Sequence, residues 1–368
     1  MKRNFIKSIS AIVTTLAITT MFAGCANNTK TNVTENTTTT TAQEDTTTSS
    51  SKTEGEKPAG MQGGRGEGAQ GGLVKEDSID TSSITNKYLD IAYANVSETQ
   101  KLDIYLPENI NESEPVPVII YVHGGGFMMG DKGSGVLGSV LEGVERGYAV
   151  VSVNYRMSGE ETFPAAVEDI KAAIRYLRAN AEEYNLDKDN FAIWGESAGG
   201  NLAAMIGTTG DDTTFDNASL GNVDESSAVQ AVVDWFGPLQ FTEMDNQFAA
   251  LGLTPKMGAT NTSESPESKY IGVDISQNPE AAEKANPANY ISENDPAFLI
   301  QHGTADTNVP ITQSENFAKA LEAIIGSENV TFEAMEGAAH GDFGAVKAFE
   351  TEENINRVFE FLDSQLKN

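Results

Sequence analysis

Short apolar segments alternate with amphipathic segments along the chain from residue 88 onward. Two of them, 116–123 and 148–154, are almost continuously apolar, which is typical of strands buried on both faces of a sheet. The predicted strands share this pattern and are residues 88–96, 102–106, 116–123, 148–154, 191–194, 229–236, 297–301 and 330–335. We expect the first two to be edge strands.

Helices are predicted between these strands. Pro164 opens a segment whose apolar residues recur every three or four positions and form one stripe along a helix packed on a sheet: Val167, Ile170, Ile174, Leu177, Ala181 and Tyr184. Further helices are expected at 198–207, 311–325 and 352–366. This alternation predicts an α/β fold with a doubly wound, mostly parallel sheet, in which ligands bind at the carboxyl ends of the strands.

One segment interrupts the alternation. Residues 239–295 contain many Pro, Asn, Ser and Gly residues and no long periodic helix, and they are too many for an ordinary connection in a compact domain. Because this insertion follows a central strand, we expect it to cover the carboxyl edge of the sheet as a cap. The alternative is a surface excursion with no functional role.

The amino terminus has the pattern of an export signal. A basic start is followed by an apolar stretch from Ile9 to Phe22 that is short for a membrane span, and then by Ala23, Gly24 and Cys25. This resembles a bacterial lipoprotein signal, which implies a signal peptide at 1–24 and lipidation of Cys25. The protein would then be anchored by lipid to the outer face of the cell membrane; the alternative is ordinary secretion.

Composition separates the next segment from the rest of the chain. Residues 34–48 are mostly threonine, and residues 60–72 are rich in glycine with almost no large apolar side chain. Such segments bury too little surface to offset the entropy of ordering, so residues 25–82 are predicted to be a disordered linker. Residues 83–368 remain as the catalytic domain.

Charge and cysteine content exclude several partners. The chain has 368 residues, of which 54 are acidic and 24 basic, and its net charge is −30. A polyanion of this kind repels nucleic acid and anionic lipid headgroups, so neither is an expected partner. With a single cysteine, no intramolecular disulfide can form.

The strongest chemical motif is Gly195-Glu196-Ser197-Ala198-Gly199. It lies between a short apolar strand and a helix of small residues, which is the context in which G-x-S-x-G forms a nucleophile elbow. Such a turn is tight enough to need glycine on both sides of the serine, and it exposes the serine hydroxyl above the sheet. Two further features agree with this interpretation: the glycine motif His123-Gly124-Gly125-Gly126-Phe127, and the order Ser197, Asp306, His340 along the chain.

These motifs carry a family resemblance over about residues 88–366. The glycine motif, Asn154-Tyr155-Arg156 and the elbow together resemble the α/β-hydrolase fold of the hormone-sensitive-lipase-like esterases. Other segments are similar to a narrower group, the bacterial bifunctional carbohydrate-binding feruloyl esterases and acetyl-xylan esterase-like hydrolases. Those segments are Val233-Asp234-Trp235-Phe236-Gly237-Pro238, Ser265-Pro266-Glu267-Ser268, Ala285-Asn286-Pro287 and His302-Gly303-Thr304-Ala305-Asp306.

The resemblance implies a role for each motif residue. Ser197 is the nucleophile, His340 the general base, and Asp306 orients the imidazole and stabilises its cation. An oxyanion hole would be formed by the backbone N–H groups of Gly125, Gly126 and Ala198, where glycine lets the main chain approach the substrate.

Four residues have competing interpretations. The chain has only three histidines, and His302 is expected to be packed and hydrogen-bonded rather than to act as the base. Asp234, at the end of an earlier strand, is the alternative acid. Glu196 is expected to anchor its loop through hydrogen bonds, and Phe236 to belong to the core, with lining the pocket as its alternative.

The sequence therefore predicts a serine carboxylic-ester hydrolase that acts through an acyl-enzyme and needs neither a metal nor another cofactor. From the family resemblance, its substrates would be acetyl or feruloyl esters of plant-wall polysaccharide fragments. One alternative is a peptidase of the prolyl-oligopeptidase type, which shares the fold and the triad order, although the glycine motif argues against it. The other is a non-catalytic, carbohydrate-binding surface lipoprotein.

Overall fold

The computed structural model describes residues 78–111, 113–133, 135–210, 212–341 and 348–367. The predicted signal peptide, Cys25 and the predicted linker up to residue 77 lie outside the described residues. Ile79, near the end of that predicted linker, packs against the core, and its amide donates a hydrogen bond to the carbonyl of Gly133 (2.8 Å). Within the described ranges, no helix is both long and apolar enough to cross a membrane.

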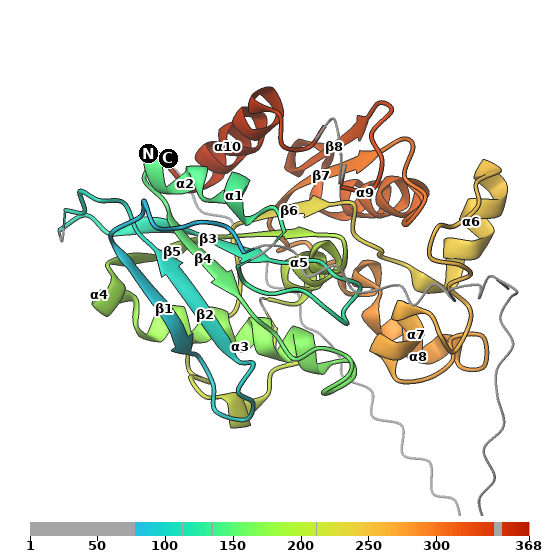
Figure 1. Cartoon of the computed structure of the whole chain (residues 1–368), viewed down its shortest axis with the longest axis horizontal. Coiled ribbons are helices and arrows are strands. Elements are labelled where there is room, and N and C mark those ends of the chain that lie inside the picture. The colour runs from blue at the N-terminus through green and yellow to red at the C-terminus, as the bar shows by residue number, and fades with distance from the viewer. Residues whose placement is uncertain (1–77, 112, 134, 211, 342–347, 368) are drawn as a thin grey trace, which may run out of the picture. The chain divides into compact units, whose positions relative to one another are not determined.

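An eight-stranded sheet forms the centre of the fold (Figure 1). Its strands follow the order β1-β2-β4-β3-β5-β6-β7-β8. β2 pairs antiparallel with β1 and β4, and the other neighbouring strands pair in parallel, which confirms the predicted mostly parallel sheet. The strands are β1 (Lys87–Ala92), β2 (Lys101–Tyr105), β3 (Val116–Val122), β4 (Ala149–Val153), β5 (Leu186–Glu196), β6 (Ala231–Trp235), β7 (Ala297–Gly303) and β8 (Val330–Met335).

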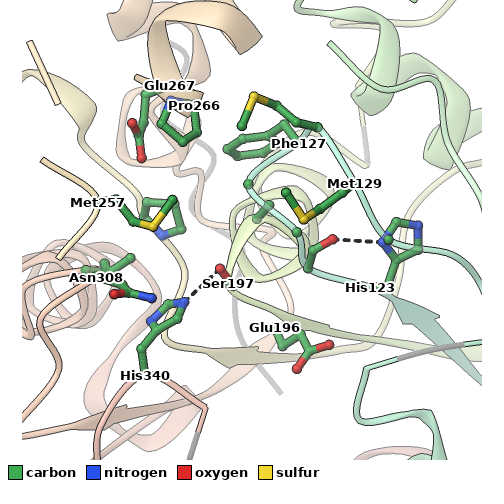
Figure 2. Close-up of a pocket in the computed structure, with 18 of the residues that line it drawn as sticks. His123, Phe127, Met129, Glu196, Ser197, Met257, Pro266, Glu267, Asn308 and His340 are labelled. Carbon is green, nitrogen blue, oxygen red and sulfur yellow. Dashed lines mark hydrogen bonds between the residues drawn. The ribbon is translucent and has the colours of Figure 1, made fainter. Parts of the chain in front are cut away.

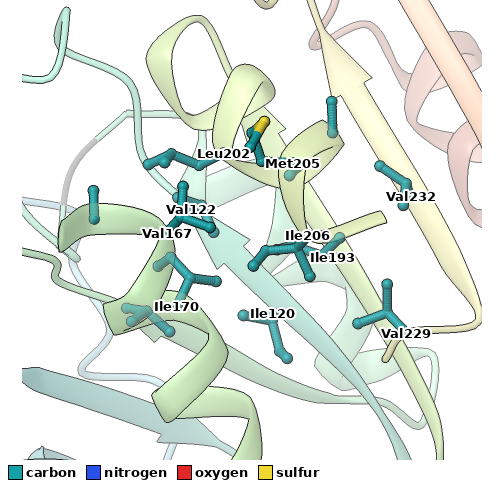
Figure 3. Close-up of a cluster of buried hydrophobic side chains, with 14 of the residues drawn as sticks. Ile120, Val122, Val167, Ile170, Ile193, Leu202, Met205, Ile206, Val229 and Val232 are labelled. Atoms are coloured by element: carbon teal, nitrogen blue, oxygen red, sulfur yellow. The ribbon is translucent and has the colours of Figure 1, made fainter. Parts of the chain in front are cut away.

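Helices cover both faces of the sheet, because each central strand presents apolar side chains to both sides. Ile120 and Ile193 pack with side chains of α3 and α5 on one face (Figure 3), whereas Tyr121 and Trp194 pack with Phe359 of α10 on the other. α9 joins the first face, and α1 and α2 join the second. These helices are α1 (Leu137–Val140), α2 (Glu142–Glu145), α3 (Ala165–Ala179), α5 (Ala198–Thr209), α9 (Thr312–Ile325) and α10 (Glu352–Leu366).

Two sequence-based expectations need correction. β2 is not an edge strand, because it is paired on both sides and the antiparallel β1 lies outside it. The helix that begins after Pro164 does not continue to Tyr184. It ends at Ala179 with Asn180 as its C-cap, and a separate turn, α4 (Ala181–Tyr184), follows. The side chain of Asn180 donates to the carbonyl of Tyr176 (2.7 Å), and such side-chain bonds to the backbone compete with helix continuation.

The insertion consists of short helices. α6 (Met244–Leu251), α7 (Pro266–Ile271) and α8 (Pro279–Ala282) are joined by loops and by the 3₁₀ turns η2 (Phe241–Glu243), η3 (Glu283–Ala285) and η4 (Pro287–Tyr290). Ser265 caps α7 by accepting a hydrogen bond from the amide of Ser268, and Pro266 occupies the first turn. Asp245 of α6 accepts from the amides of Thr260 and Asn261 and so fixes the loop that leads to α7.

Candidate active site

The serine lies in a strained turn between β5 and α5. Ser197 has φ 52° and ψ −121°, a conformation that is rare for a residue with a side chain. A Cβ on Gly195 would collide with the carbonyl of Gly199, and one on Gly199 would collide with the carbonyl of Val122. Both glycines of the motif are therefore required by backbone contact, as expected for a nucleophile elbow.

The structure brings the three predicted catalytic residues together. His340 Nε2 lies 2.9 Å from Ser197 Oγ (Figure 2), and His340 Nδ1 lies 2.7 Å from Asp306 Oδ2. Asp306 follows β7 and His340 follows β8, so both reach Ser197 from the carboxyl edge of the sheet. Because Nδ1 faces a carboxylate, it carries the proton, which leaves Nε2 to accept the hydrogen bond from the serine hydroxyl.

Asp306 is buried and receives several donors. Its Oδ1 accepts hydrogen bonds from the amides of Asn308 (2.7 Å) and Val309 (2.9 Å). Burial alone would raise the pKa of Asp306, but the neighbouring His340 imidazole and the hydrogen bonds from both histidines outweigh it and hold the pKa well below its usual range. The carboxylate is thus ionised under all ordinary conditions and can stabilise an imidazolium at His340.

His302 is buried and supports the acid instead of acting as the base. Its Nε2 faces two acceptors, the carbonyl of Val309 (3.0 Å) and Asp306 Oδ2 (3.3 Å), so this nitrogen carries the proton. Its Nδ1 lies 2.7 Å from Ser314 Oγ, which donates to it in the neutral tautomer. The prediction of a packed, hydrogen-bonded histidine agrees with this geometry.

Asp234 does not take the place of Asp306. It is fully buried, and its Oδ1 accepts a hydrogen bond from the amide of Gly237 (3.0 Å). Burial raises the pKa of Asp234 to about 6, which is the opposite of what a triad acid needs. Its position next to Gly200 and Gly237 places it beneath the elbow as a structural group.

The glycine motif lies beside Ser197 with a backbone that only glycine adopts easily. Gly125 has φ +106° and Gly126 φ +60°, and a Cβ on Gly125 would collide with the carbonyl of Met129. Ala198 is the first residue of α5, so its amide has no carbonyl four residues earlier in the helix to bond. The three amides predicted to form an oxyanion hole thus surround the same pocket as Ser197.

The segment Asn154-Tyr155-Arg156 contacts the glycine motif through Tyr155. The Tyr155 hydroxyl donates to the carbonyl of His123 (3.0 Å), and the two rings stack with centroids 4.6 Å apart. Arg156 forms hydrogen bonds with both carboxylate oxygens of the buried Asp169 in α3. Glu196 accepts a hydrogen bond from the Tyr121 hydroxyl (2.8 Å), which agrees with its expected anchoring role.

A pocket of about 680 Å³ opens over Ser197. Its floor, meaning the residues from strand ends and the glycine motif, includes Gly125, Ser197 and His340. Phe236 also lines it, with its ring 4.7 Å from that of His340, so this residue is both core and pocket. Its wall, meaning the residues contributed by the insertion, consists of Met257, Gly258, Thr260, Ser265, Pro266 and Glu267.

Several pocket residues were not identified as such from the sequence, among them Met257, Glu267 and Asn308. Glu267 belongs to a segment that carried only family resemblance, although Ser-Pro-Glu is also a helix-start pattern that could have placed it in the first turn of a helix. No sequence signal points to Met257. In the described ranges, no group of three or more His, Cys, Asp or Glu residues is arranged to hold a metal ion.

Comparison with known proteins agrees with this geometry. The BD-FAE family model matches residues 102–321, more than half of the chain. The chain belongs to the BD-FAE family. This membership confirms the narrower of the two resemblances found in the sequence. The matched range begins within β2 and includes the following strands as far as β7, together with the insertion.

Individual relatives of this BD-FAE member are esterases by name. Esterase LipQ of Mycobacterium tuberculosis is 30% identical over 251 residues, covering 68% of this chain and 56% of LipQ. Esterase LipC of the same organism is 28% identical over 242 residues, covering 66% of this chain and 57% of LipC. The chain thus spans little more than half the length of these curated relatives.

Solved structures give the same fold. The bifunctional GH43-CE protein of Bacteroides eggerthii superposes with a TM-score of 0.67 at 33% identity, covering 76% of this chain and 35% of that one. A truncated carbohydrate esterase from gut microbiota gives 0.68 at 30% identity and covers 79% of this chain and 100% of that one. The predicted α/β-hydrolase fold is therefore confirmed.

Proposed function

We propose that this BD-FAE protein is a serine carboxylic-ester hydrolase that acts through an acyl-enzyme on Ser197. The observation that carries the proposal is the hydrogen-bonded series Ser197, His340, Asp306 at the base of an open pocket, with the serine in an elbow. The esterase names of its relatives support the same reaction class.

The geometry supports the following steps for the proposed reaction. As Ser197 Oγ bonds to the ester carbonyl carbon, its proton passes to His340 Nε2, and Asp306 stabilises the resulting imidazolium. The carbonyl oxygen becomes an oxyanion next to the amides of Gly125, Gly126 and Ala198. The bond to the alcohol oxygen then breaks, and His340 gives its proton to that oxygen. A water molecule then gives a proton to His340 Nε2 as its oxygen bonds to the acyl carbon. The bond from that carbon to Ser197 Oγ breaks, His340 returns the proton to Oγ, and the carboxylic acid is released.

Two variants and one label test the reaction class. Hydrolysis of p-nitrophenyl acetate should disappear in Ser197→Ala and in His340→Ala, because each lacks a group that forms or breaks a bond. A fluorophosphonate probe should label the wild type but not Ser197→Ala. Full activity in both variants would exclude the mechanism, and faster cleavage of an aminoacyl-proline amide than of an ester would indicate a peptidase instead.

The proposed substrates are fragments of plant-wall polysaccharide that carry acetyl or feruloyl groups. Support comes from family membership and from structural neighbours, one of which is named a carbohydrate esterase. A panel of acetylated and feruloylated xylo-oligosaccharides tests this. The substrate proposal fails if simple alkyl esters of similar size are hydrolysed with much higher kcat/KM than every member of the panel.

We also propose that Cys25 is lipidated and that the hydrolase is held at the outer face of the cell membrane. Support comes from the signal pattern before Cys25, and a Gly/Ser-like linker of the following residues would span on the order of 40 Å. Cys25→Ala should release the protein into the medium with unchanged kinetics on a soluble ester. Retention in the membrane fraction as firm as that of the wild type would contradict lipidation.

A further inference from the structure

The pocket is chemically asymmetric about Ser197. Figure 2 shows Glu267, Met257 and Asn308 to the left of the serine with His340, and Phe127, Met129, Glu196 and His123 to the right. Glu196 and His123 are held by the protein itself, Glu196 by the Tyr121 hydroxyl and His123 by stacking on Tyr155. Glu267 and Asn308 therefore lie across the nucleophile from the apolar Phe127 and Met129. Such an arrangement can orient a substrate that has one polar and one apolar part.

Reaction chemistry determines which part of an ester meets the polar side. His340 Nε2 must protonate the alcohol oxygen, so the alcohol leaves next to His340, whereas the carbonyl oxygen points toward Gly125 and Gly126. Asn308 and Glu267 lie on the His340 side (Figure 2). The alcohol part of a bound ester is thus the part that these two side chains would contact.

Glu267 is held in place by its surroundings. It occupies the first turn of α7, whose start is fixed by the Ser265 cap, and the preceding Pro266 packs over the glycine motif, 3.4 Å from where a Cβ of Gly126 would be. Burial raises the pKa of the Glu267 carboxyl to about 7, so it is mostly ionised at pH 8. No lysine or arginine is among the residues that line the described pocket.

Asn308 adds a second polar group at the same side. Figure 2 shows its amide nitrogen on the side of His340 and Ser197 and its oxygen turned away from them. The amide nitrogen can donate a hydrogen bond to the oxygen of a sugar hydroxyl, and the Glu267 carboxylate can accept one from a sugar O–H.

From these observations we infer that Glu267 and Asn308 recognise the alcohol part of the substrate, and that they select a neutral, polyhydroxylated alcohol and disfavour an anionic one. Hydroxyl groups of a sugar would donate to Glu267 and accept a hydrogen bond from Asn308, whereas an acidic alcohol would meet a carboxylate with no basic side chain to offset it. This inference rests on the proposed esterase function and adds the side chains that recognise the alcohol and the charge that they disfavour.

Glu267→Leu tests the hydrogen-bonding part. At pH 8 the variant should raise KM for acetylated xylobiose on the order of 10-fold or more, because a hydrogen bond to a charged group is lost. The rise in KM for p-nitrophenyl acetate, whose alcohol has no hydroxyl beyond the reacting one, should be several-fold smaller. Equal losses on both substrates would show a structural role and overturn the inference.

Glu267→Gln tests the charge part with a side chain of the same shape. The substrates are 4-acetoxybenzoate, whose alcohol part is anionic, and its neutral methyl ester. The wild type should prefer the methyl ester, and Glu267→Gln should reduce that preference several-fold. An unchanged preference would overturn the role assigned to the carboxylate charge.

Glu264→Gln is the matched control. Glu264 lies three residues earlier, is 86% exposed, pairs with Lys269 (3.4 Å) and does not line the pocket. Glu264→Gln removes one negative charge from the same region without changing the pocket, so the kinetics on all four substrates should stay as in the wild type. If the wild type fails to hydrolyse even p-nitrophenyl acetate, the proposed function itself is wrong, which is a different result from any change confined to Glu267 variants.

Discussion

The floor and the wall of one pocket are built in different ways. The floor, taken here together with Asp306, which supports His340 from below, is built from strand ends. Each of these residues is fixed by neighbours, as Asp306 is by two amides and two histidines. The wall comes from an insertion of helices no longer than eight residues, and its Met257 is 61% exposed. The sheet thus fixes the reacting groups, whereas the wall is formed by loops and short helices, with side chains as exposed as Met257. Changes in the floor should therefore alter every reaction, and changes in the wall only some.

The largest effect is expected from Asp306→Asn in the floor. Asparagine keeps the shape but cannot stabilise an imidazolium, and it can donate to Nδ1 of His340, which favours the wrong tautomer for accepting the serine proton. We expect kcat on p-nitrophenyl acetate to fall on the order of 10⁴-fold, as for the corresponding change in serine proteases. Stopped assays with large amounts of enzyme can measure this, and the same fall should be seen with every ester.

Asp234→Asn provides the contrasting change, because it should keep activity and alter stability. The pKa of Asp234 is about 6 in the folded protein and about 3.8 in the unfolded chain. Between these pH values the folded state binds the proton that the unfolded state releases, so this group's contribution to stability falls as pH rises from about 4 to 6. Above pH 6 the ionised, buried carboxylate lowers the free energy of unfolding by its full amount, on the order of 3 kcal/mol.

Asparagine at position 234 carries no charge, so it avoids the free-energy cost of a buried, ionised Asp234. Asp234→Asn should match the wild type in urea unfolding at pH 4 and be more stable at pH 8, by up to the same amount. Comparing the two proteins at each pH cancels the contributions of the other titrating groups. If Asp234 were the triad acid, the variant would instead lose activity on the scale expected for Asp306→Asn.

The difference between the floor and the wall also explains which parts of the site could be predicted from the sequence. Ser197, Asp306 and His340 follow apolar strands, and parallel strands end at one edge, so patterning and order were enough to bring them together. β8 was predicted with its observed limits, and β5 was predicted too short because Asp187 to Asn190 at its start are polar. The wall has no such periodicity. Its position depends on tertiary contacts, such as the Asp245 carboxylate that holds Thr260, and Glu267 was missed for that reason.

An intermediate effect is expected from His302→Leu. His302 Nε2 lies 3.3 Å from Asp306 Oδ2, a long contact, so its loss should lower kcat several-fold with little change in KM. Without this donor Asp306 should hold the imidazolium of His340 more strongly. The acidic limb of the pH profile of kcat/KM should therefore move to higher pH. A fall in activity without such movement would mean that His302 matters only for packing.

The smallest effect is expected from Met257→Ala in the wall. The exposed side chain buries little surface, so the free energy of unfolding should change by less than about 0.5 kcal/mol. Methyl acetate should be hydrolysed at nearly the wild-type rate, since Met257 has no part in the triad. An aromatic alcohol on the His340 side can reach Met257, where a thioether can contact its ring, so the KM for benzyl acetate should rise by about two- to fivefold. Kinetics on methyl acetate and benzyl acetate would check this, and equal changes for both would mean that the wall, like the floor, acts on the reaction itself.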